Sequence, residues 1–348
     1  MAEFISFQPS DFFSPKLYTG TGSSNAITGV GFQPDFTWIK DRDTTHENQL
    51  VDSVRGVSKI WFSDDTGVEV TDAAGLTAFG ADGFTVNTRG AMNASSDDFV
   101  SWNWKMGTTS GIGGSPSTTP EGYSFSATAG QSIIYYIGTS VAGGGPIATL
   151  PHGLTKAPEF IIVKNLTAAA RDTATYHVST GNTKRIYLNQ GVAPNVTSTA
   201  WNDTTPGATV FTVGANEAVN ELSKYLVAYC FTSIKGYSQF SSYTGNANAD
   251  GTFVYTGFRP AFVLIKSVST TNWNMFDDKR ATYNPASYPL WANTDAAEQT
   301  DPYPIDMLSN GFKARSVSSQ VNSAQEYVYA AFAEFPIVSS NDVPTVAR

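Results

Sequence analysis

Residues 31–40 read GFQPDFTWIK, and two later stretches of the chain repeat their pattern. Residues 155–164 read TKAPEFIIVK, and residues 257–266 read GFRPAFVLIK. Each copy has a proline, a phenylalanine two residues later and a lysine six residues after the proline. Proline has no N–H to donate to a strand ladder, so it suits the start of a strand. The apolar run that follows, rich in β-branched and aromatic residues, predicts a strand buried on at least part of both faces.

Two further landmarks accompany each copy in the same order. A Tyr-x-Gly pattern precedes the proline, at residues 18–20, 136–138 and 243–245. An aromatic-rich stretch follows it, at residues 98–105, 224–231 and 326–332. The spacing from the proline is 65 residues to Phe99 in the first copy, and 67 residues to Tyr225 and to Tyr327 in the others. Landmarks in constant order at near-constant spacing predict three tandem copies of one fold.

Composition agrees with a β-rich chain that has many turns. Only 15% of the 348 residues are charged, whereas glycine (30 residues) and aromatic residues (13%) are plentiful. This composition fits an array of strands and turns better than a helical enzyme. The formal net charge of -9 repels phosphate backbones. We therefore expect no nucleic-acid partner.

The chain shows no sign of secretion or membrane insertion. Its single cysteine, Cys230, excludes an internal disulfide and lies in an apolar stretch that predicts burial. The first residues lack a basic region followed by an apolar run, and no segment approaches the roughly 18 apolar residues of a membrane span. We expect a protein made and folded in a cytosol, which would leave the cell by assembly or lysis.

The predicted fold is all-β, with three tandem antiparallel β-sandwich domains of jelly-roll type. A linker of glycine, serine, threonine and proline marks the clearest boundary. The predicted segments are an N-terminal anchoring arm at 1–16, repeat one at 17–106, the linker at 107–120, repeat two at 121–235, repeat three at 236–337 and a polar tail at 338–348.

The arm contains four phenylalanines in a segment too short to form a core of its own. These residues are Phe4, Phe7, Phe12 and Phe13. Exposed aromatic residues of this kind predict packing on a neighbour, either the first repeat or another subunit. The segment is thus predicted to be an anchoring arm.

A search for catalytic chemistry gives negative results. The three histidines, His46, His152 and His177, do not have the spacing of metal ligands on one element. Nucleophile-elbow, phosphate-loop and dinucleotide-binding motifs are absent. Adjacent acids such as Asp64 and Asp65 would point to opposite faces of a strand, so they do not make an acid/base pair. We expect no enzyme activity, no metal and no cofactor.

One polar position recurs in all three repeats. Asp52, His177 and Asp277 lie 17 to 19 residues after the prolines, and two of them begin an Asp-x-x-Arg pattern that ends at Arg55 and Arg280. One interpretation is a salt bridge or hydrogen bond that fixes the exit of a strand. The other is a polar ligand pocket at a loop end of the sandwich.

Aromatic residues in polar loops are the second kind of candidate, because sugar-binding surfaces use exposed Trp and Tyr faces. Trp201 is followed by Asn202 and Asp203 in a loop that continues to a Pro-Gly turn. This loop predicts a contact with a ligand. Trp273, flanked by two asparagines, is the next candidate.

The last strands of repeats two and three predict self-association. Residues 225–231 and 327–335 are long, nearly free of charge and apolar at alternate and intervening positions. Strands that are apolar on both faces need either a central position in a sheet or a partner. Closed cyclic oligomers cover such surfaces. We expect a homo-oligomer, with a trimer as the predicted number.

Several stretches resemble a repeated domain in virion proteins of tailed bacteriophages, especially marine ones. The resemblance rests on residues 31–40, 52–56, 79–84, 201–204, 243–246, 257–266 and 304–313. It implies an exterior structural protein, an elongated object with the arm as its anchor and the later repeats presented outward. It transfers no catalytic residue. The implied location is the virion, which the protein reaches from the host cytoplasm by lysis rather than by secretion.

Together these features lead to a non-enzymatic tail fibre or spike that contacts a glycan or protein on the host surface. A head fibre or capsid decoration protein is the nearest alternative, and it would share the fold. A polysaccharide-degrading tailspike is the third. Short length, the lack of a β-helix repeat and the lack of a convincing carboxylate pair weigh against it. The expected partners are other virion proteins, copies of the chain itself and the host surface.

Overall fold

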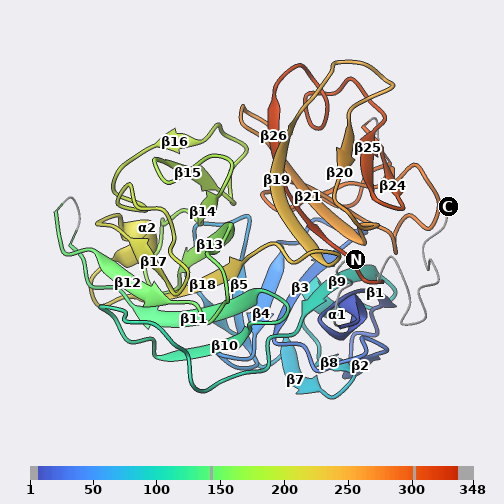
Figure 1. Ribbon diagram of the computed structural model, residues 1–348. Helices are drawn as coiled ribbons and strands as arrows, with labels where there is room; N and C mark the ends of the chain where they lie inside the picture. The colour runs from blue at the N-terminus through green and yellow to red at the C-terminus, as the bar shows by residue number, and fades with distance from the viewer. Residues whose placement is uncertain (1–6, 142–143, 301–302, 336–348) are drawn as a thin grey trace.

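The computed structural model describes residues 7–141, 144–300 and 303–335. The chain is all-β, as predicted, and its sheets are antiparallel (Figure 1). The α-helices of the described residues, α1 (Gly90–Asn93) and α2 (Glu217–Asn220), are single turns. A 3-10 turn, η1 (Pro9–Asp11), precedes the first strand.

Each repeat contributes one large sheet, and the three large sheets share a strand order apart from an extra edge strand at the start of the second. The first is β1 (Phe13–Thr19), β9 (Asp98–Trp104), β3 (Phe36–Asp41), β4 (Gln49–Asp52), β5 (Lys59–Phe62) and β6 (Val70–Thr71). The second is β10 (Gly122–Ser126), β11 (Gln131–Ile137), β18 (Tyr225–Phe231), β13 (Phe160–Asn165), β14 (Ala174–His177), β15 (Lys184–Tyr187) and β16 (Asn195–Val196). The third is β19 (Ser238–Thr244), β26 (Glu326–Phe332), β21 (Phe262–Ser267), β22 (Asn274–Asp277) and β23 (Leu290–Trp291). The Pro-x-Phe strand therefore occupies the same place each time.

Each repeat also has a small sheet. In the first repeat its order is β2 (Asn25–Thr28), β8 (Gly83–Val86) and β7 (Leu76–Gly80). The second repeat pairs β12 (Ala148–Pro151) with β17 (Val210–Val213), and the third has β20 (Phe253–Tyr255), β25 (Gly311–Ala314) and β24 (Ile305–Leu308). Separate hydrophobic clusters lie between each small sheet and one face of the large sheet of its repeat.

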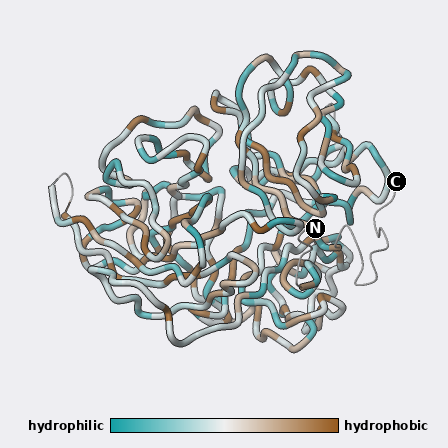
Figure 2. Tube along the Cα trace, in the orientation of Figure 1, coloured by the Kyte–Doolittle hydropathy of each residue, from teal (hydrophilic) through white to brown (hydrophobic). Residues whose placement is uncertain are grey.

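The other faces of the three large sheets meet in one central cluster. Its rings come from all three repeats, and they include Phe36, Trp104, Phe160, Phe231, Phe262 and Phe332. The ring centroids of Trp104 and Phe231 both lie 5.6 Å from that of Phe332. Figure 1 shows the three lobes around this shared centre, and Figure 2 shows hydrophobic segments along the strands of each lobe. The three lobes thus pack on one another around a shared core, which differs from the elongated object that the resemblance implies.

The predicted arm belongs to this core from residue 7 onward. Phe13 is fully buried in β1, and its ring stacks on Phe332 at 5.3 Å. Phe7 lies 5.0 Å from Phe12 and 5.5 Å from Tyr237, ring centre to ring centre. Phe13 is therefore not available to anchor another protein, whereas anchoring through the partly buried Phe7 and Phe12 stays a prediction. Phe4 lies outside the described residues.

The strands that suggested self-association are central strands. β18 lies between β11 and β13, and β26 lies between β19 and β21. One face of each packs in the central cluster, and the other packs toward the small sheet of its repeat. Their apolar faces are covered within the chain, so they give no support to a trimer. The oligomeric state stays a prediction.

Candidate functional site

The Asp-x-x-Arg pairs are buried ion pairs at the ends of strands. Asp52 ends β4 and accepts the backbone N–H groups of Val54 and Arg55 at 3.1 and 2.9 Å, while Arg55 Nε donates to its carboxylate at 2.6 Å. In the third repeat Arg280 Nε donates to Asp277 at the same distance, 2.6 Å. The side chains of both pairs are at most 2% exposed. The interpretation as salt bridges that fix the strand exit describes them correctly.

Both aspartates also accept a hydrogen bond from a neighbouring repeat. The hydroxyl of Tyr229, from repeat two, donates to Asp52 at 2.6 Å. The indole Nε1 of Trp102, from repeat one, donates to Asp277 at 3.2 Å. Trp102 and Tyr229 hold the same register position in β9 and β18, because each lies opposite the third residue of its Pro-x-Phe strand. The acidic position thus joins repeats as well as ending strands.

The same register explains why repeat two has a histidine, His177, where the other repeats have an aspartate. The register position that holds Trp102 and Tyr229 is occupied by Ala330 in β26. Alanine has no side-chain donor, and the available partner is the backbone carbonyl of Tyr329, which lies 3.1 Å from His177 Nε2. A carboxylate could not donate to a carbonyl, whereas an imidazole can. Burial lowers the pKa of His177 to about 4, so the ring is neutral at pH 7.

The lysine of the repeated motif makes a second set of contacts between repeats. Lys40 Nζ donates to the carbonyl of Asp295 in repeat three at 3.0 Å, and Lys164 donates to the carbonyl of Asp65 in repeat one at 2.8 Å. Lys266 lies 3.4 Å from the carbonyl of Gly191 in repeat two. Burial lowers the pKa of each amine to about 8. The lysines of repeats two and three thus each hold the preceding repeat, and the lysine of repeat one closes the circle by holding repeat three.

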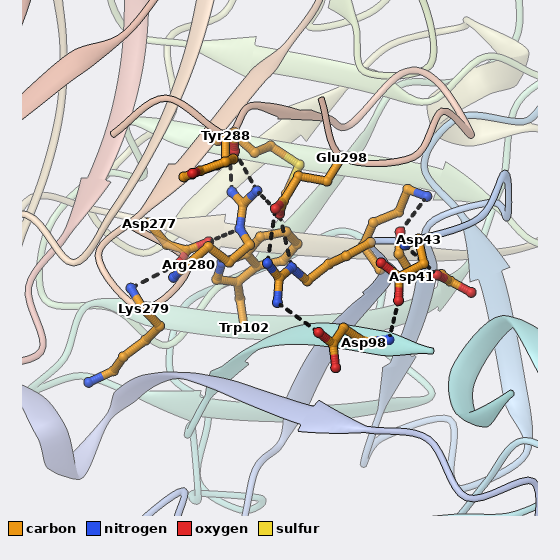
Figure 3. Close-up of polar contacts among 12 residues, drawn as sticks. Asp41, Asp43, Asp98, Trp102, Asp277, Lys279, Arg280, Tyr288 and Glu298 are labelled. Carbon is orange, nitrogen blue, oxygen red and sulfur yellow. Dashed lines mark hydrogen bonds and ion pairs between the residues drawn. The ribbon is translucent and has the colours of Figure 1, made fainter. Parts of the chain in front are cut away.

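Figure 3 shows the polar contacts where repeats one and three meet. Glu298 accepts hydrogen bonds from Arg42 at 2.9 and 3.0 Å and from Arg280 at 2.9 Å. The hydrogen bond to Glu298 is the main cause that raises the pKa of Arg42. Arg42 also approaches Asp98 at 3.8 Å.

The second interpretation of the recurring polar position was a ligand pocket formed by Asp52, Arg55, His177, Asp277 and Arg280. This interpretation loses its basis, because these side chains are buried and already paired within the chain.

The two tryptophans expected in exposed loops are buried. Trp201 is 1% exposed, donates from Nε1 to the carbonyl of Lys184 at 3.0 Å and packs against Tyr176. Trp273 is fully buried in the central cluster and donates to the carbonyl of Tyr187 at 2.8 Å. The expectation that both are exposed is wrong, because polar neighbours in sequence do not reveal that a loop folds inward.

The residues after Trp201 do lie at the surface. Asn202 and Asp203 are exposed, with backbone φ angles of 52° and 48° in a tight turn. The side chain of Asn182 donates to the carbonyl of Asp203 at 2.9 Å and holds the turn in place. A ligand contact at these two residues stays a prediction.

A polar cleft of about 310 Å³ opens in repeat two. It lies between the loop after β13, strand β15 and the start of α2, where Asn216 caps the helix by accepting the N–H of Ala218 at 3.0 Å. Its lining residues are Ala170, Arg171, Asp172, Arg185, Thr199, Ala215, Asn216, Glu217 and Ala218. The lining of the cleft therefore contains positively charged, negatively charged and neutral hydrogen-bonding side chains.

The two arginines of the cleft differ in their partners. Arg171 binds Glu217 at 3.0 Å and Glu221 at 2.9 Å, and the bond to Glu221 is the main cause that raises its pKa. Arg185 lies 4.5 Å above the ring of Tyr187 and donates to its hydroxyl at 2.6 Å and to Asn216 at 2.7 Å. Within the described chain, these hydrogen-bond partners of Arg185 are neutral and its buried Nε has none. This guanidinium can bind a ligand carboxylate or hydroxyl.

The sequence contains one overlooked signal for this cleft. Strand pairing shows that Ile186 corresponds to Trp61 in repeat one and to Leu290 in repeat three. Arg185, one residue earlier, therefore corresponds to Ile60 and Pro289. An arginine where one counterpart is a buried isoleucine marks a local change in surface chemistry. The rest of the lining comes from separate segments, which only the fold brings together.

Replacing Asp278 with asparagine should stabilise the protein at pH 8 and not at pH 4. Its carboxylate is 7% exposed and lies 3.2 Å from Arg259, yet burial raises its pKa to about 7. When the pKa of a carboxyl group is higher in the folded state than its unfolded value of 3.8, the folded protein loses stability as pH rises between the two values. The asparagine variant avoids this loss. We expect its free energy of unfolding at pH 8 to exceed that of the wild type by about 1–3 kcal/mol, after allowing for the weakened contact with Arg259.

Urea unfolding of wild type and variant across this pH range measures the difference. Replacing Asp203, an exposed acid, with asparagine is the control and should change little at either pH. A difference between wild type and the Asp278 variant that does not depend on pH would contradict the prediction.

In the described part of the chain, no helix is long and apolar enough to cross a membrane. The same residues contain no group of three or more histidine, cysteine or acidic side chains placed to hold a metal ion.

No curated protein and no solved structure matches the chain. A family model does match, and its description is "Domain of unknown function (DUF7483)". The match extends over residues 8–336, so it covers all three repeats and the core they share. The chain is therefore a member of the DUF7483 family.

Proposed function

We propose that this protein is a non-enzymatic structural protein on the exterior of a tailed-bacteriophage virion, where it acts as a tail fibre or spike that contacts the host surface. We also propose that each repeat is one antiparallel β-sandwich, formed by a large sheet and the small sheet that covers it. The order of strands and the clusters between the sheets support this division.

The polar cleft of repeat two is the observation that carries the host-contact proposal. Arg185 has a fixed position, because Tyr187 lies beneath it and Asn216 accepts its hydrogen bond, and it has no acidic partner among the contacts described. A preorganised guanidinium in a cleft of about 310 Å³ suits recognition of a polar group on a cell surface.

The contrast between inner and outer residues supports the same proposal. The lysines and strand-end residues that join the repeats occupy equivalent positions in all three. The outer surfaces differ, and the cleft with its arginine pair is built from residues of repeat two alone. Recognition sites commonly lie on variable loops held by a constant scaffold.

Immunogold labelling of purified particles of the virus that encodes the chain tests this proposal. An antibody against the recombinant protein should label the outside of the tail. Label on the capsid instead would favour a head fibre or decoration protein, and particles without label would contradict an exterior virion role. Release of reducing ends from host envelope polysaccharide by the purified chain would contradict the non-enzymatic part and favour a tailspike enzyme.

A further inference from the structure

The outer face of the small sheet in repeat three carries two exposed aromatic rings. Phe253 is 44% exposed and Tyr255 is 64% exposed, whereas Val254 between them is 6% exposed and belongs to the core. Alternation along β20 places both rings on the outer face, about 6.6 Å apart along the strand at a rise of about 3.3 Å per residue. The two rings therefore form one aromatic surface.

The fold does not need these rings. The equivalent outward positions of β2 hold Ala26 and Thr28, which are exposed without any large apolar group. In β12 the first equivalent position is Thr149, whose hydroxyl accepts the backbone N–H of Ser117 in the linker at 2.7 Å. Packing of the sandwich works in both cases with small side chains. The aromatic surface is thus a feature of repeat three alone.

Paired charges surround the two rings. Lys313 lies opposite Phe253 on β25, and it binds Asp250 at 2.6 Å. Arg315, two residues further along the chain, binds Asp306 of β24 at 3.3 Å. Two cations and two carboxylates leave this face without net charge. They also supply hydrogen-bond donors and acceptors beside the rings.

This combination matches a sugar better than a protein partner. A pyranose has an apolar C–H face, which can pack on an aromatic ring, and a rim of hydroxyls that both donate and accept. A stable protein interface needs about 800 Å² on each partner and a desolvated apolar centre. Two rings set among ion pairs provide too little apolar surface for such a centre, and neutral surroundings favour an uncharged ligand.

We propose that the outer face of β20, β25 and β24 binds a neutral glycan. Phe253 and Tyr255 stack on successive sugar rings, while Lys313 and Asp306 hold the hydroxyls at the edge. This inference rests on the proposed function, since a host surface would supply the glycan. It names a site on repeat three that is separate from the cleft of repeat two.

Calorimetric titration of the full chain tests the site. The probes are hexasaccharides of β-1,4-glucose, α-1,4-glucose, β-1,4-mannose and N-acetylglucosamine, with heparin as the anionic comparison. At least one neutral probe should bind, and Phe253→Ala or Tyr255→Ala should weaken it about tenfold or more. Tyr255→Phe keeps the ring and should keep most of the affinity. The control is Tyr225→Ala, which removes a 38% exposed tyrosine from repeat two and should change nothing.

Four outcomes would overturn the inference. Three come from the titration: no neutral probe binds, only heparin binds, or Tyr255→Ala leaves the binding intact. The fourth is a wild-type dimer in sedimentation that Tyr255→Ala converts to a monomer. Unfolding curves of the variants confirm that each is folded before it is titrated. Sugar binding is measured on the isolated chain, so its failure is distinct from failure of the particle labelling.

Discussion

Residues 114–348 expressed without residues 1–113 should fail to fold into a soluble monomer. Removing repeat one takes away Phe36, Trp102 and Trp104, and uncovers the faces of Phe262 and Phe332 in the central cluster. Each large ring that returns to water costs on the order of 2 kcal/mol, which for several rings equals the whole stability of a typical domain. Size-exclusion chromatography and thermal unfolding of the fragment measure the result.

Co-expression provides the control for this experiment. Residues 1–113 and 114–348 made together should associate, because the cut lies in the glycine-rich linker and leaves every strand whole. A protease site placed at the same point and cleaved after folding should leave the two parts bound. A monomeric 114–348 fragment that unfolds cooperatively, with a midpoint close to that of the full chain, would show that repeats two and three do not need the core they share with repeat one.

Replacing Arg280 with leucine should lower the free energy of unfolding by about 3–5 kcal/mol. The substitution leaves the buried carboxylate of Asp277 without its cation and removes a hydrogen bond to Glu298. It also removes the donors to the carbonyls of Met275 and Tyr288. Chemical denaturation of the two proteins at pH 7 measures the change.

Two further variants separate charge from packing. Arg55→Leu, in the equivalent pair of repeat one, should cost a similar amount because Asp52 is equally buried. Arg315→Leu removes an arginine that is 44% exposed and should cost less than about 1 kcal/mol. Adding Asp277→Asn to Arg280→Leu should recover part of the loss. A loss below about 1 kcal/mol for Arg280→Leu would contradict a role for this pair in holding the repeats together.

The repeated motif predicted local structure correctly but could not show how the repeats are arranged. Proline, β-branched residues and near-constant spacing identify β3, β13 and β21, and the structure gives all three the same neighbours. The motif lysine was visible in the sequence as well. Its role was not, because its acceptor lies in another repeat, 255 residues away in the case of Lys40 and Asp295.

The expected exposure of Trp201 was wrong for a related reason. Exposure of Trp201 was inferred from short polar neighbours, yet the indole has an acceptor in the carbonyl of Lys184, a residue of β15. Likewise Phe13, in a segment too short to form a core, packs against Phe262 and Phe332 of repeat three. Local composition predicts which residues can be buried, but long-range packing decides which of them are.

The circular set of contacts has a consequence for the order in which the chain is synthesised. Repeat one leaves the ribosome with an aromatic face that is completed only when Phe262 and Phe332 arrive. The bond between Lys40 and Asp295 must likewise wait for almost the entire chain. Contacts of such long sequence separation slow folding, and the nascent chain keeps adhesive surface exposed in the meantime. We therefore expect this protein to need chaperone protection during translation, and its yield to fall sharply when translation outpaces that protection.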